Sequence, residues 1–474
     1  MRKTLRDIII STIILIVAAA LVWNYYDISI FLNWVKIYNE LGLLNLYTMY
    51  RYNQSYRVVY LPLAPLTFIA FYSLGEKTTN IILNNTISSL TPEYTEYIKL
   101  TLIRIFSKLP LVLMVYLTAY LLYKKERNYE IIKWWFYNIP LILAVATYQF
   151  DPIMVFFLLL GTYLLLEDKL LYAGISWGIG SAIKQVPIIL LPIVYMYLRD
   201  RSKFTKFLLS FALTILIISL PFMLVDPVSF INNALGFHGD RPPQYLSVFN
   251  IPVLLSGRDP QVTNTVINIW PYVFSLIYIL ILLTLKIKPR DKDSLFKSIL
   301  AILLIFTVFN KVVNPNYLLW TYPYAIYVLL KNRDERGLKL LIIASIIAMS
   351  WPGICFYTAA VLNKPVYIEE EMKYYDARTL VEKSFQGYGR ILLQLALTIG
   401  YMIKPVIQFI YDNLNIIGVI LISSYTSIMI YVLFYNVYDI RGFNDLKIKV
   451  INGIKHIKNV ILAKQENAIR SSTV

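Results

Sequence analysis

Long apolar segments recur along the chain, and short clusters of charged residues separate many of them. A helix needs about 20 apolar residues to cross a bilayer straight. Several segments here are shorter, so we expect some to be half-helices or to extend through flanking residues. The thirteen predicted spanning segments are 8–26, 98–123, 134–148, 152–166, 170–183, 187–198, 207–225, 265–285, 295–309, 316–331, 338–360, 389–411 and 415–438.

This pattern predicts an all-α, polytopic transmembrane protein of about 13 helices. Composition agrees, because hydrophobic residues make up 58% of the 474 positions and charged residues only 15%, against about 25% charged residues in soluble domains. Residues 1–26 begin basic and turn apolar like a signal peptide. The apolar run is long and lacks a clear cleavage site, which favours a retained first helix.

The positions of the basic residues explain the net charge of +17. Positive residues gather in short connectors, a feature typical of the cytoplasmic side of a membrane protein. We therefore expect membrane lipids, and no nucleic acid, as partners. The connectors that carry this argument are 124–127, 199–203, 286–292 and 331–336.

The segment 61–74 decides the predicted topology, because it holds only fourteen residues and contains two prolines near its start. If it crossed, all four basic connectors would lie outside; if it is re-entrant or flat at the interface, they all lie in the cytoplasm. We prefer the second interpretation. It predicts a first outer loop over 27–97, with two interfacial helices.

The same parity places 149–151, 226–264, 311–316 and the acidic stretch 369–371 outside. It also places the basic tail outside, against the positive-inside rule. Two explanations stay open: one late segment does not cross, or the tail is an exception. The predicted organisation is a catalytic core over 1–360, an outer loop with C-terminal helices over 361–440, and a basic tail over 441–474.

Metal and cofactor chemistry have little support in the sequence. Cys355 is the only cysteine, which excludes a disulfide framework and a thiolate metal site. His238 and His456 are the only histidines. We expect neither a metal ion nor a cofactor.

Polar residues instead collect near the predicted outer ends of the helices, which suits an amphipathic substrate with its head group at the interface. Asp27 follows the first apolar segment between aromatic residues, where a raised carboxyl pKa would suit a general base. The alternative is a solvated aspartate or a cap on the next helix. Gln149 and Asp151 form a polar turn before Pro152, in which Asp151 also suits a helix N-cap.

Two later loops carry cations. In 237–247, His238 and Arg241 lie in a turn beside prolines and could bind a phosphate, or Arg241 pairs with Asp240 or another acid. In 310–320, Lys311 is a point charge suited to phosphate. Tyr317 and Trp320 are three residues apart on one helix face, where they would stack on a sugar, line a lipid chain or belong to the interfacial aromatic belt.

Three further cations lie within or between apolar segments. Arg104 and Lys108 are four residues apart and share a helix face, and Lys184 lies in the turn between two half-helices. Each either extends its charge to the interface or holds a lipid phosphate.

These residues resemble motifs of the GT-C superfamily of membrane glycosyltransferases, nearest to polyprenyl-phosphate-mannose-dependent mannosyltransferases of the GPI-anchor type and their prokaryotic relatives. The most specific match is Phe309-Asn310-Lys311-Val312 followed by Tyr317-Leu318-Leu319-Trp320. It is similar to that group's Phe-Asn-Lys-Val…Gln-Tyr-Phe-Leu-Trp signature, with Asn316 in place of glutamine. Further similar elements are Gln149-x-Asp151, Lys184-Gln185-Val186-Pro187, Arg241…Gln244…Ser247 and Tyr60-Leu61-Pro62-Leu63.

One departure concerns the first outer loop. The GPI-type enzymes carry an Asp-x-Asp pair after the first helix, whereas this chain has Asp27-Ile28-Ser29. The resemblance therefore supports a single carboxylate there and weakens the case for a metal. Residues 361–474 resemble nothing in that superfamily.

The resemblance implies an inverting transfer of a hexose, with mannose favoured, from a polyprenyl or dolichyl phosphate carrier to a lipid- or protein-linked glycan. Asp27 would be the general base. His238, Arg241 and Lys311, with Arg104, Lys108 and Lys184, would bind the donor phosphate. Gln149, Asp151, Gln244, Tyr317 and Trp320 would contact sugar or acceptor. The expected location is the cell membrane, or the endoplasmic reticulum membrane in a eukaryote.

Three rival interpretations are a surface-glycan ligase or polymerase with a lipid pyrophosphate donor, a lipid-linked sugar transporter or flippase, and a non-catalytic scaffold. A transporter favours internal repeats and charges near the midplane, and the sequence shows neither. A scaffold explains the hydropathy but not the clustered polar residues. Donor type separates the two enzymes.

Overall fold

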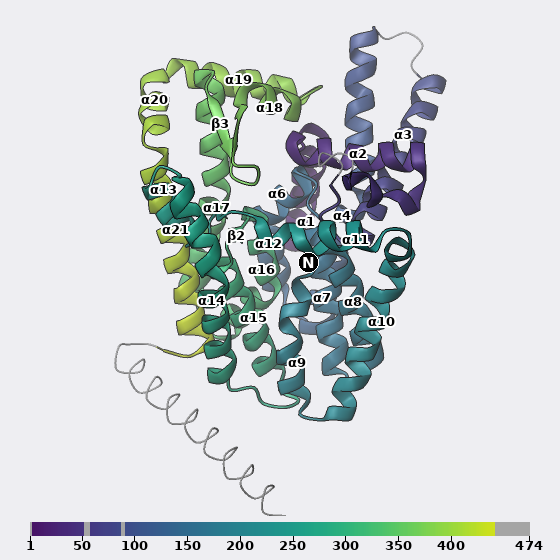
Figure 1. Cartoon of the computed structure of the whole chain (residues 1–474), viewed down its shortest axis with the longest axis vertical. Helices are drawn as coiled ribbons and strands as arrows, with labels where there is room; N and C mark the ends of the chain where they lie inside the picture. The colour runs from purple at the N-terminus through teal and green to yellow at the C-terminus, as the bar shows by residue number, and fades with distance from the viewer. Residues whose placement is uncertain (1, 52–56, 87–90, 441–474) are drawn as a thin grey trace, which may run out of the picture.

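The structure, a computed structural model, describes residues 2–51, 57–86 and 91–440, most of which are α-helical (Figure 1). Five of the described helices are long and apolar enough to cross a membrane, or up to seven if each of two bent pairs counts as one span. These findings indicate an integral membrane protein of the predicted all-α class, while the count of about 13 remains a prediction. The five are α4 (Pro92–Glu126), α10 (Arg201–Val225), α14 (Pro260–Thr284), α17 (Glu335–Leu362) and α21 (Leu414–Tyr431) with its π-helical extension η7 (Val432–Val437).

The first bent pair is α1 (Arg2–Leu21) with α2 (Tyr25–Leu41), which turn by 70° at the break between them. We take α1 as the spanning member, because α2 carries Asp27, Lys36 and Glu40. The second pair is α19 (Gly389–Met402) with α20 (Lys404–Asp412), bent by 88°.

Shorter helices fill the interior, as the short apolar segments predicted. Most residues of α15 and α16 are buried. Helix α8 packs tightly on α10, because a Cβ atom on Gly174 would lie 2.4 Å from the backbone oxygen of Phe207. The interior helices are α5 (Tyr129–Phe136), α6 (Ile139–Ala146), α7 (Asp151–Leu166), α8 (Leu170–Ile183), η4 (Val186–Leu190), α9 (Leu191–Leu198), α15 (Lys292–Phe309), η6 (Pro315–Tyr317) and α16 (Leu318–Lys331).

The basic connectors meet at one end of the molecule, which we call the basic end. There Lys292 pairs with Glu126 at 2.5 Å and Lys203 pairs with Asp168 at 2.5 Å. The Tyr438 hydroxyl, just after η7, lies 2.8 Å from that of Thr284 at the same end. The residues that precede the tail are therefore on the side of the basic connectors (Figure 1). The tail itself, 441–474, lies outside the described residues.

The next feature is the bend between α19 and α20, which bears on the side at which the residues before the tail lie. The sequence predicted a crossing over 389–411, but the 88° bend prevents a straight one. Figure 1 shows α18 (Ala377–Ser384), α19 and α20 together at the end opposite to the basic end. Of the two explanations left open above, the structure favours the first, in which one late segment does not cross.

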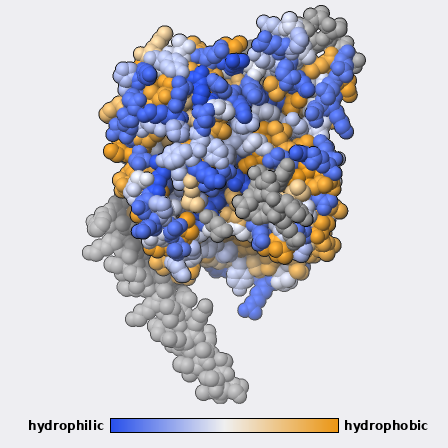
Figure 2. Space-filling view, turned by 45° about the horizontal axis from the view of Figure 1, so that its top comes forward, coloured by the Kyte–Doolittle hydropathy of each residue, from blue (hydrophilic) through white to orange (hydrophobic). Residues whose placement is uncertain are grey.

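The opposite end, which we call the site end, holds the irregular part of the fold. Two small sheets occur here, which the all-α prediction did not include: β1 (Gln244–Tyr245) pairs in parallel with β2 (Val312–Val313), and β3 (Pro365–Ile368) forms an antiparallel hairpin with β4 (Lys373–Asp376). Figure 2 shows that hydrophilic residues predominate over much of this end and hydrophobic residues along the sides. The helices here are η1 (Leu43–Asn45), η2 (Thr48–Arg51), α11 (Pro227–Ile231), the π-helical η5 (Asn232–Gly236), α12 (Phe237–Asp240) and α13 (Asn250–Leu255).

The proline-rich segment of the first outer loop forms α3 (Leu63–Thr86), which continues ten or more residues beyond the predicted apolar stretch. It packs along α4, and a Cβ atom on Gly75 would lie only 2.9 Å from that of Phe106. Helix α3 is not among the five candidate spans. Helices α2 and α3 lie in the region of the predicted loop, and their placement at the interface remains a prediction.

Candidate active site

Asp27 owes its place to the break between α1 and α2. The side chain of Asn24 caps α2 by accepting a hydrogen bond from the backbone N–H of Tyr26. Asp27 therefore lies in the first turn of α2. It does not cap α2, which corrects that alternative interpretation of the sequence.

The Asp27 carboxylate is held by two amides. Asn24 Nδ2 and Gln149 Nε2 each donate to Asp27 Oδ2 at 2.8 Å. No described residue donates to Oδ1. One oxygen is thus fixed and the other can accept a proton, which is the arrangement a general base needs.

The pKa of Asp27 is raised to about 6, mainly by burial and next by the negative charge of Glu370. The hydrogen bond from Gln149 and the charge of Arg241 oppose this rise in pKa. Burial disfavours the charged form of a carboxyl group. The raised pKa predicted from the aromatic surroundings is confirmed, and it leaves Asp27 ionised at neutral pH while making it a better proton acceptor.

Two arginines lie at the same end and share one carboxylate. Arg241 Nη2 lies 3.0 Å from Glu370 Oε2, and Arg57 Nη2 lies 3.0 Å from Glu370 Oε1. Glu370 belongs to the turn of the β3–β4 hairpin. Arg241 therefore pairs with an acid, as the second interpretation allowed, but the acid is distant in sequence and is not Asp240. We call Arg57, Arg241 and Glu370 the arginine cluster.

Two buried donors in or beside the arginine cluster have no acceptor among the described residues. They are Arg241 Nε and Gln244 Nε2. The side-chain oxygen Oε1 of Gln244 already accepts from Arg241 Nη2 at 2.5 Å. Such unpaired donors are unfavourable in a buried site unless a ligand supplies acceptors. Phosphate and hydroxyl oxygens are suitable acceptors.

The parallel pairing of β1 with β2 joins the two cation-bearing loops. Gln244 is in register with Val312 and Tyr245 with Val313. Lys311 donates to the carbonyl oxygen of Gly239, and its ammonium group lies 5.1 Å from the ring centre of Trp270. The two loops predicted to share one face are therefore in direct contact.

His238 differs from the cationic role expected of it. Its Nε2 atom lies 3.0 Å from the Val59 carbonyl oxygen, so that nitrogen must carry the proton. Burial, and next the charge of Arg241, lower the pKa of His238 to about 4. At neutral pH the imidazole is uncharged and acts as a hydrogen-bond donor.

Asp151 is the centre of a second, deeper cluster. Its side chain is fully buried and accepts from Lys184 Nζ at 2.9 Å, from Asn316 Nδ2 at 2.6 Å and from the indole N–H of Trp320. It does not cap α7, whose N-cap is Phe150. The partners come from the C-cap of α8, from η6 and from α16, so the carboxylate ties three elements together and supports Gln149 two residues earlier.

The aromatic pair beside Asp151 is also buried. Tyr317 and Trp320 stack on each other with ring centres 4.0 Å apart. Lys184 Nζ lies 4.5 Å from the ring centre of Tyr317. The prediction that these two rings share a helix face is confirmed, but in this structure each stacks on the other and on a cation.

Arg104 and Lys108 serve the ends of helices. Lys108 Nζ donates to the carbonyl oxygens of Ala19, Val22 and Ala146 at 2.5–2.9 Å, which uses all three of its donors. Arg104 donates to the carbonyl oxygens of Leu21 and Gln386. Carbonyls at helix C-termini lack intrahelical partners, so both cations satisfy buried backbone groups near the break that positions Asp27.

Asn24, Arg57 and Glu370 are site residues that sequence reasoning missed. Arg57 Nη2 also donates to the Tyr26 hydroxyl at 2.7 Å, next to Asp27. The available signal was the acidic stretch 369–371 on the same predicted side as the cation-bearing loops. Within the described residues, no group of three or more histidine, cysteine, aspartate or glutamate side chains could hold a metal ion.

One comparison with known proteins gives a match. Residues 97–310 match the model of glycosyltransferase family 87, which is less than half of the chain. No curated protein matches. The family match supports a membrane glycosyltransferase of the GT-C type. It includes Gln149, Asp151 and Arg241, whereas Asp27 and Lys311 lie outside it.

Proposed function

We propose that this protein transfers a hexose, with mannose favoured, from a polyprenyl or dolichyl phosphate to a lipid- or protein-linked glycan, with inversion at the anomeric carbon. The observation that carries the proposal is the juxtaposition of a carboxylate fit to be a base with a cluster of cations. Asp27 has a pKa of about 6, and the charges of Arg57 and Arg241 act on it.

The reaction follows from that juxtaposition. An acceptor hydroxyl oxygen attacks the anomeric carbon from the face opposite to the phosphate, while the bond from that carbon to the phosphate oxygen breaks. Asp27 Oδ1 takes the hydroxyl proton, and the lipid phosphate leaves with the bonding electrons. Gln149 and Asn24 hold Oδ2, so the base keeps one orientation.

The leaving phosphate is assigned to the arginine cluster, with Lys311 beside it. Guanidinium groups bind phosphate in a planar, two-point manner. Glu370, which bridges the two guanidinium groups, supplies one carboxylate where the phosphate would supply its oxygens. Fixed cations stabilise the charge that develops on the leaving group.

The other expected ligands divide by their contacts. Gln244, with its unpaired Nε2 donor, stays a candidate for sugar or phosphate contact. Lys108 has no donor left for a phosphate. Asp151, Lys184, Tyr317 and Trp320 contact one another, and we assign them to the support of the site.

The test is turnover by purified protein with short-chain polyprenyl-phosphate mannose and polyprenyl-phosphate glucose. We expect release of polyprenyl phosphate, faster when a glycan or glycolipid extract is added, and faster with the mannose donor. NMR of the product then reads the anomeric configuration. Turnover of a pyrophosphate-linked glycan, with none of either monophosphate donor, would replace the proposal with a ligase.

A further inference from the structure

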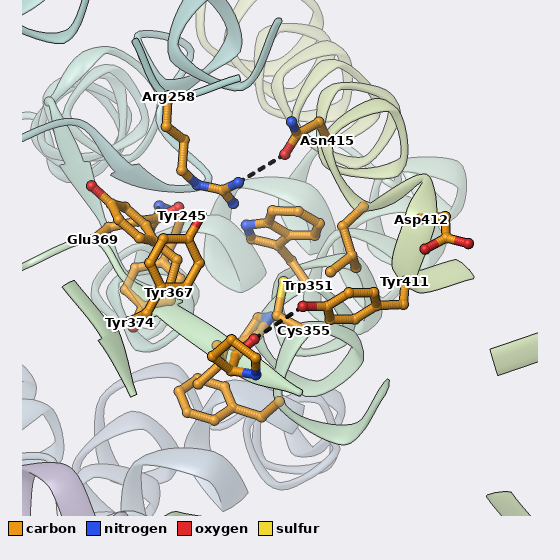
Figure 3. Close-up of a pocket in the computed structure, with 15 residues that line it drawn as sticks. Tyr245, Arg258, Trp351, Cys355, Tyr367, Glu369, Tyr374, Tyr411, Asp412 and Asn415 are labelled. Carbon is orange, nitrogen blue, oxygen red and sulfur yellow. Dashed lines mark hydrogen bonds between the residues drawn. The ribbon is translucent and has the colours of Figure 1, made fainter. Parts of the chain in front are cut away.

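A cavity lies beside the arginine cluster and is lined in part by the β3–β4 hairpin. It has a volume of about 220 Å³. Its walls come from the turn after α13, from α17, from the hairpin and from the junction of α20 with α21 (Figure 3). Most of these residues lie beyond the family match, so nothing in the comparison accounts for them.

Aromatic side chains dominate the cavity wall. Tyr367 and Tyr374 meet edge to face with ring centres 5.0 Å apart, and Trp351 lies buried at the opposite wall. Rings of this kind present flat apolar surfaces with polar edges. Such surfaces suit the apolar C–H faces of a sugar. The aromatic residues are Tyr245, Trp351, Phe356, Tyr367, Tyr374 and Tyr411.

Polar groups point into the same space. Arg258 Nη1 donates to Asn415 Oδ1 at 2.9 Å, and its guanidinium carbon lies 5.1 Å from the ring centre of Tyr367 (Figure 3). The Nε atom of Arg258 is buried and has no acceptor among the described residues. Glu369 adds a carboxylate to the lining near Arg258, whereas the Asp412 carboxylate points away from the cavity and accepts from Gln408 Nε2 at 2.7 Å (Figure 3). A carboxylate beside the arginine disfavours a phosphate and favours a neutral ligand rich in hydroxyl groups.

The cavity shares a wall with the arginine cluster. Gln244 contacts Arg241 in the cluster, whereas its neighbour Tyr245 lines the cavity. Likewise, Glu370 bridges the arginines, whereas its neighbour Glu369 lines the cavity and accepts from the Tyr245 backbone N–H at 3.0 Å. In both segments, therefore, one residue belongs to the arginine cluster or contacts it, and its neighbour in sequence lines the cavity.

We infer that this cavity, which we call the Arg258 pocket, binds a sugar residue of the acceptor glycan, adjacent to the residue that receives the hexose. The inference rests on the proposed glycosyl transfer, because it assigns the pocket to the acceptor of that reaction. Aromatic faces hold the ring, while Arg258, Glu369 and Asn415 offer donors and acceptors to its hydroxyl groups. Acceptors of two or more sugars are then preferred to single sugars.

A first experiment needs no turnover. Cys355 is the only cysteine of the chain and lines the pocket, so its rate of reaction with p-chloromercuribenzoate, which binds protonated thiols, reports occupancy. We expect at least one disaccharide among mannobiose, maltose, cellobiose, lactose and chitobiose to slow this rate in the purified protein. No protection by any of them, or protection by polyprenyl phosphate instead, overturns the inference. Cys355→Ala checks that the label is specific.

A second experiment uses variants and the acceptor. Arg258 has a φ of +66°, which asparagine tolerates, so Arg258→Asn removes the cation with little backbone strain. We expect this variant and Tyr367→Ala to raise the KM for a disaccharide acceptor by about tenfold, the loss of one charge-assisted hydrogen bond, with the KM for donor unchanged. Unchanged acceptor KM in both variants overturns the inference.

A matched pair of tyrosines controls for general damage. Tyr374 in the pocket and Tyr172 on α8 are 65% and 66% exposed. Tyr374→Ala is expected to weaken the acceptor, and Tyr172→Ala to leave it unchanged. Protection of Cys355 without turnover of either monophosphate donor would reject the proposed donor and keep the pocket. Turnover of a monophosphate donor without protection of Cys355 would keep the proposed donor and reject the pocket.

Discussion

Gln149 and Asp27 are 122 residues apart in the chain, yet Gln149 Nε2 donates a 2.8 Å hydrogen bond to Asp27 Oδ2. The turn before α7 thus sets the orientation of a carboxylate on α2. The contact crosses the edge of the family match, which begins at residue 97. It links Asp27 to the matched part of the chain.

The first prediction concerns the base. Asp27→Asn keeps the shape of the side chain and removes its proton affinity, so we expect turnover to fall by about 10²–10⁴-fold with donor binding nearly intact. Rates with saturating donor measure this. The control is Asp259→Asn at the N-cap of α14, where asparagine caps equally well. Normal turnover of Asp27→Asn would remove Asp27 as the base.

The second prediction concerns pH. Only ionised Asp27 can take a proton, and its pKa is about 6, so kcat/KM should fall as pH falls through 6 and level off above it. The charge of Glu370 raises this pKa, so Glu370→Gln should move the acid limb to lower pH. Glu130→Gln at the basic end is the control. A limb that stays in place in Glu370→Gln would contradict the assignment.

The third prediction concerns the donor phosphate. Arg241→Ala and Lys311→Ala should each weaken donor binding by roughly 30-fold or more, the usual cost of truncating a buried charged contact. Competition with polyprenyl phosphate measures the affinity. Lys203→Ala, on the basic end, should bind donor normally. Unchanged affinity in both site variants would end their assignment to the phosphate.

The fourth prediction separates support from catalysis. Asp151→Ala leaves Lys184 buried without its carboxylate, and breaking a buried ion pair typically costs about 3–5 kcal/mol. We expect a clear fall in the thermal unfolding temperature in detergent. The double variant Asp151→Ala with Lys184→Met should regain part of it, because no unpaired charge remains. A single variant as stable as the parent would show that Asp151 has no such role.

The sequence predicted those parts of the site whose cause is local. The Gln149-x-Asp151 turn, the loop that carries Arg241 and the loop that carries Lys311 all interrupt apolar helices, and the structure brings them together. The expected rise in the pKa of Asp27 also followed from local aromatic neighbours. Short apolar segments predicted the short interior helices for the same reason.

The missed features depend on contacts between distant segments. Arg57 pairs with Glu370 across more than 300 residues, and no spacing in the chain announces such a pair. Lys108 meets carbonyl oxygens at the ends of α1 and α6, so its apparent fit to a lipid phosphate could not be judged before those ends were placed. The 88° bend within the segment 389–411 was missed for a similar reason, because apolar content does not reveal a bend.

The bridge made by Glu370 has a consequence for how a donor would enter. Arg57 also pairs with Glu371 at 3.2 Å, so two carboxylates already balance the two guanidinium groups. Such a site binds an anion mainly by exchanging it for one of these carboxylates. Selection then depends on the difference between the binding free energies of the carboxylate and of the donor phosphate. Salt screens both interactions alike and therefore alters this difference little. A free sugar has no anionic group that could replace a carboxylate. Admission to the site would thus be governed by a hairpin in the last quarter of the chain, far from the family match.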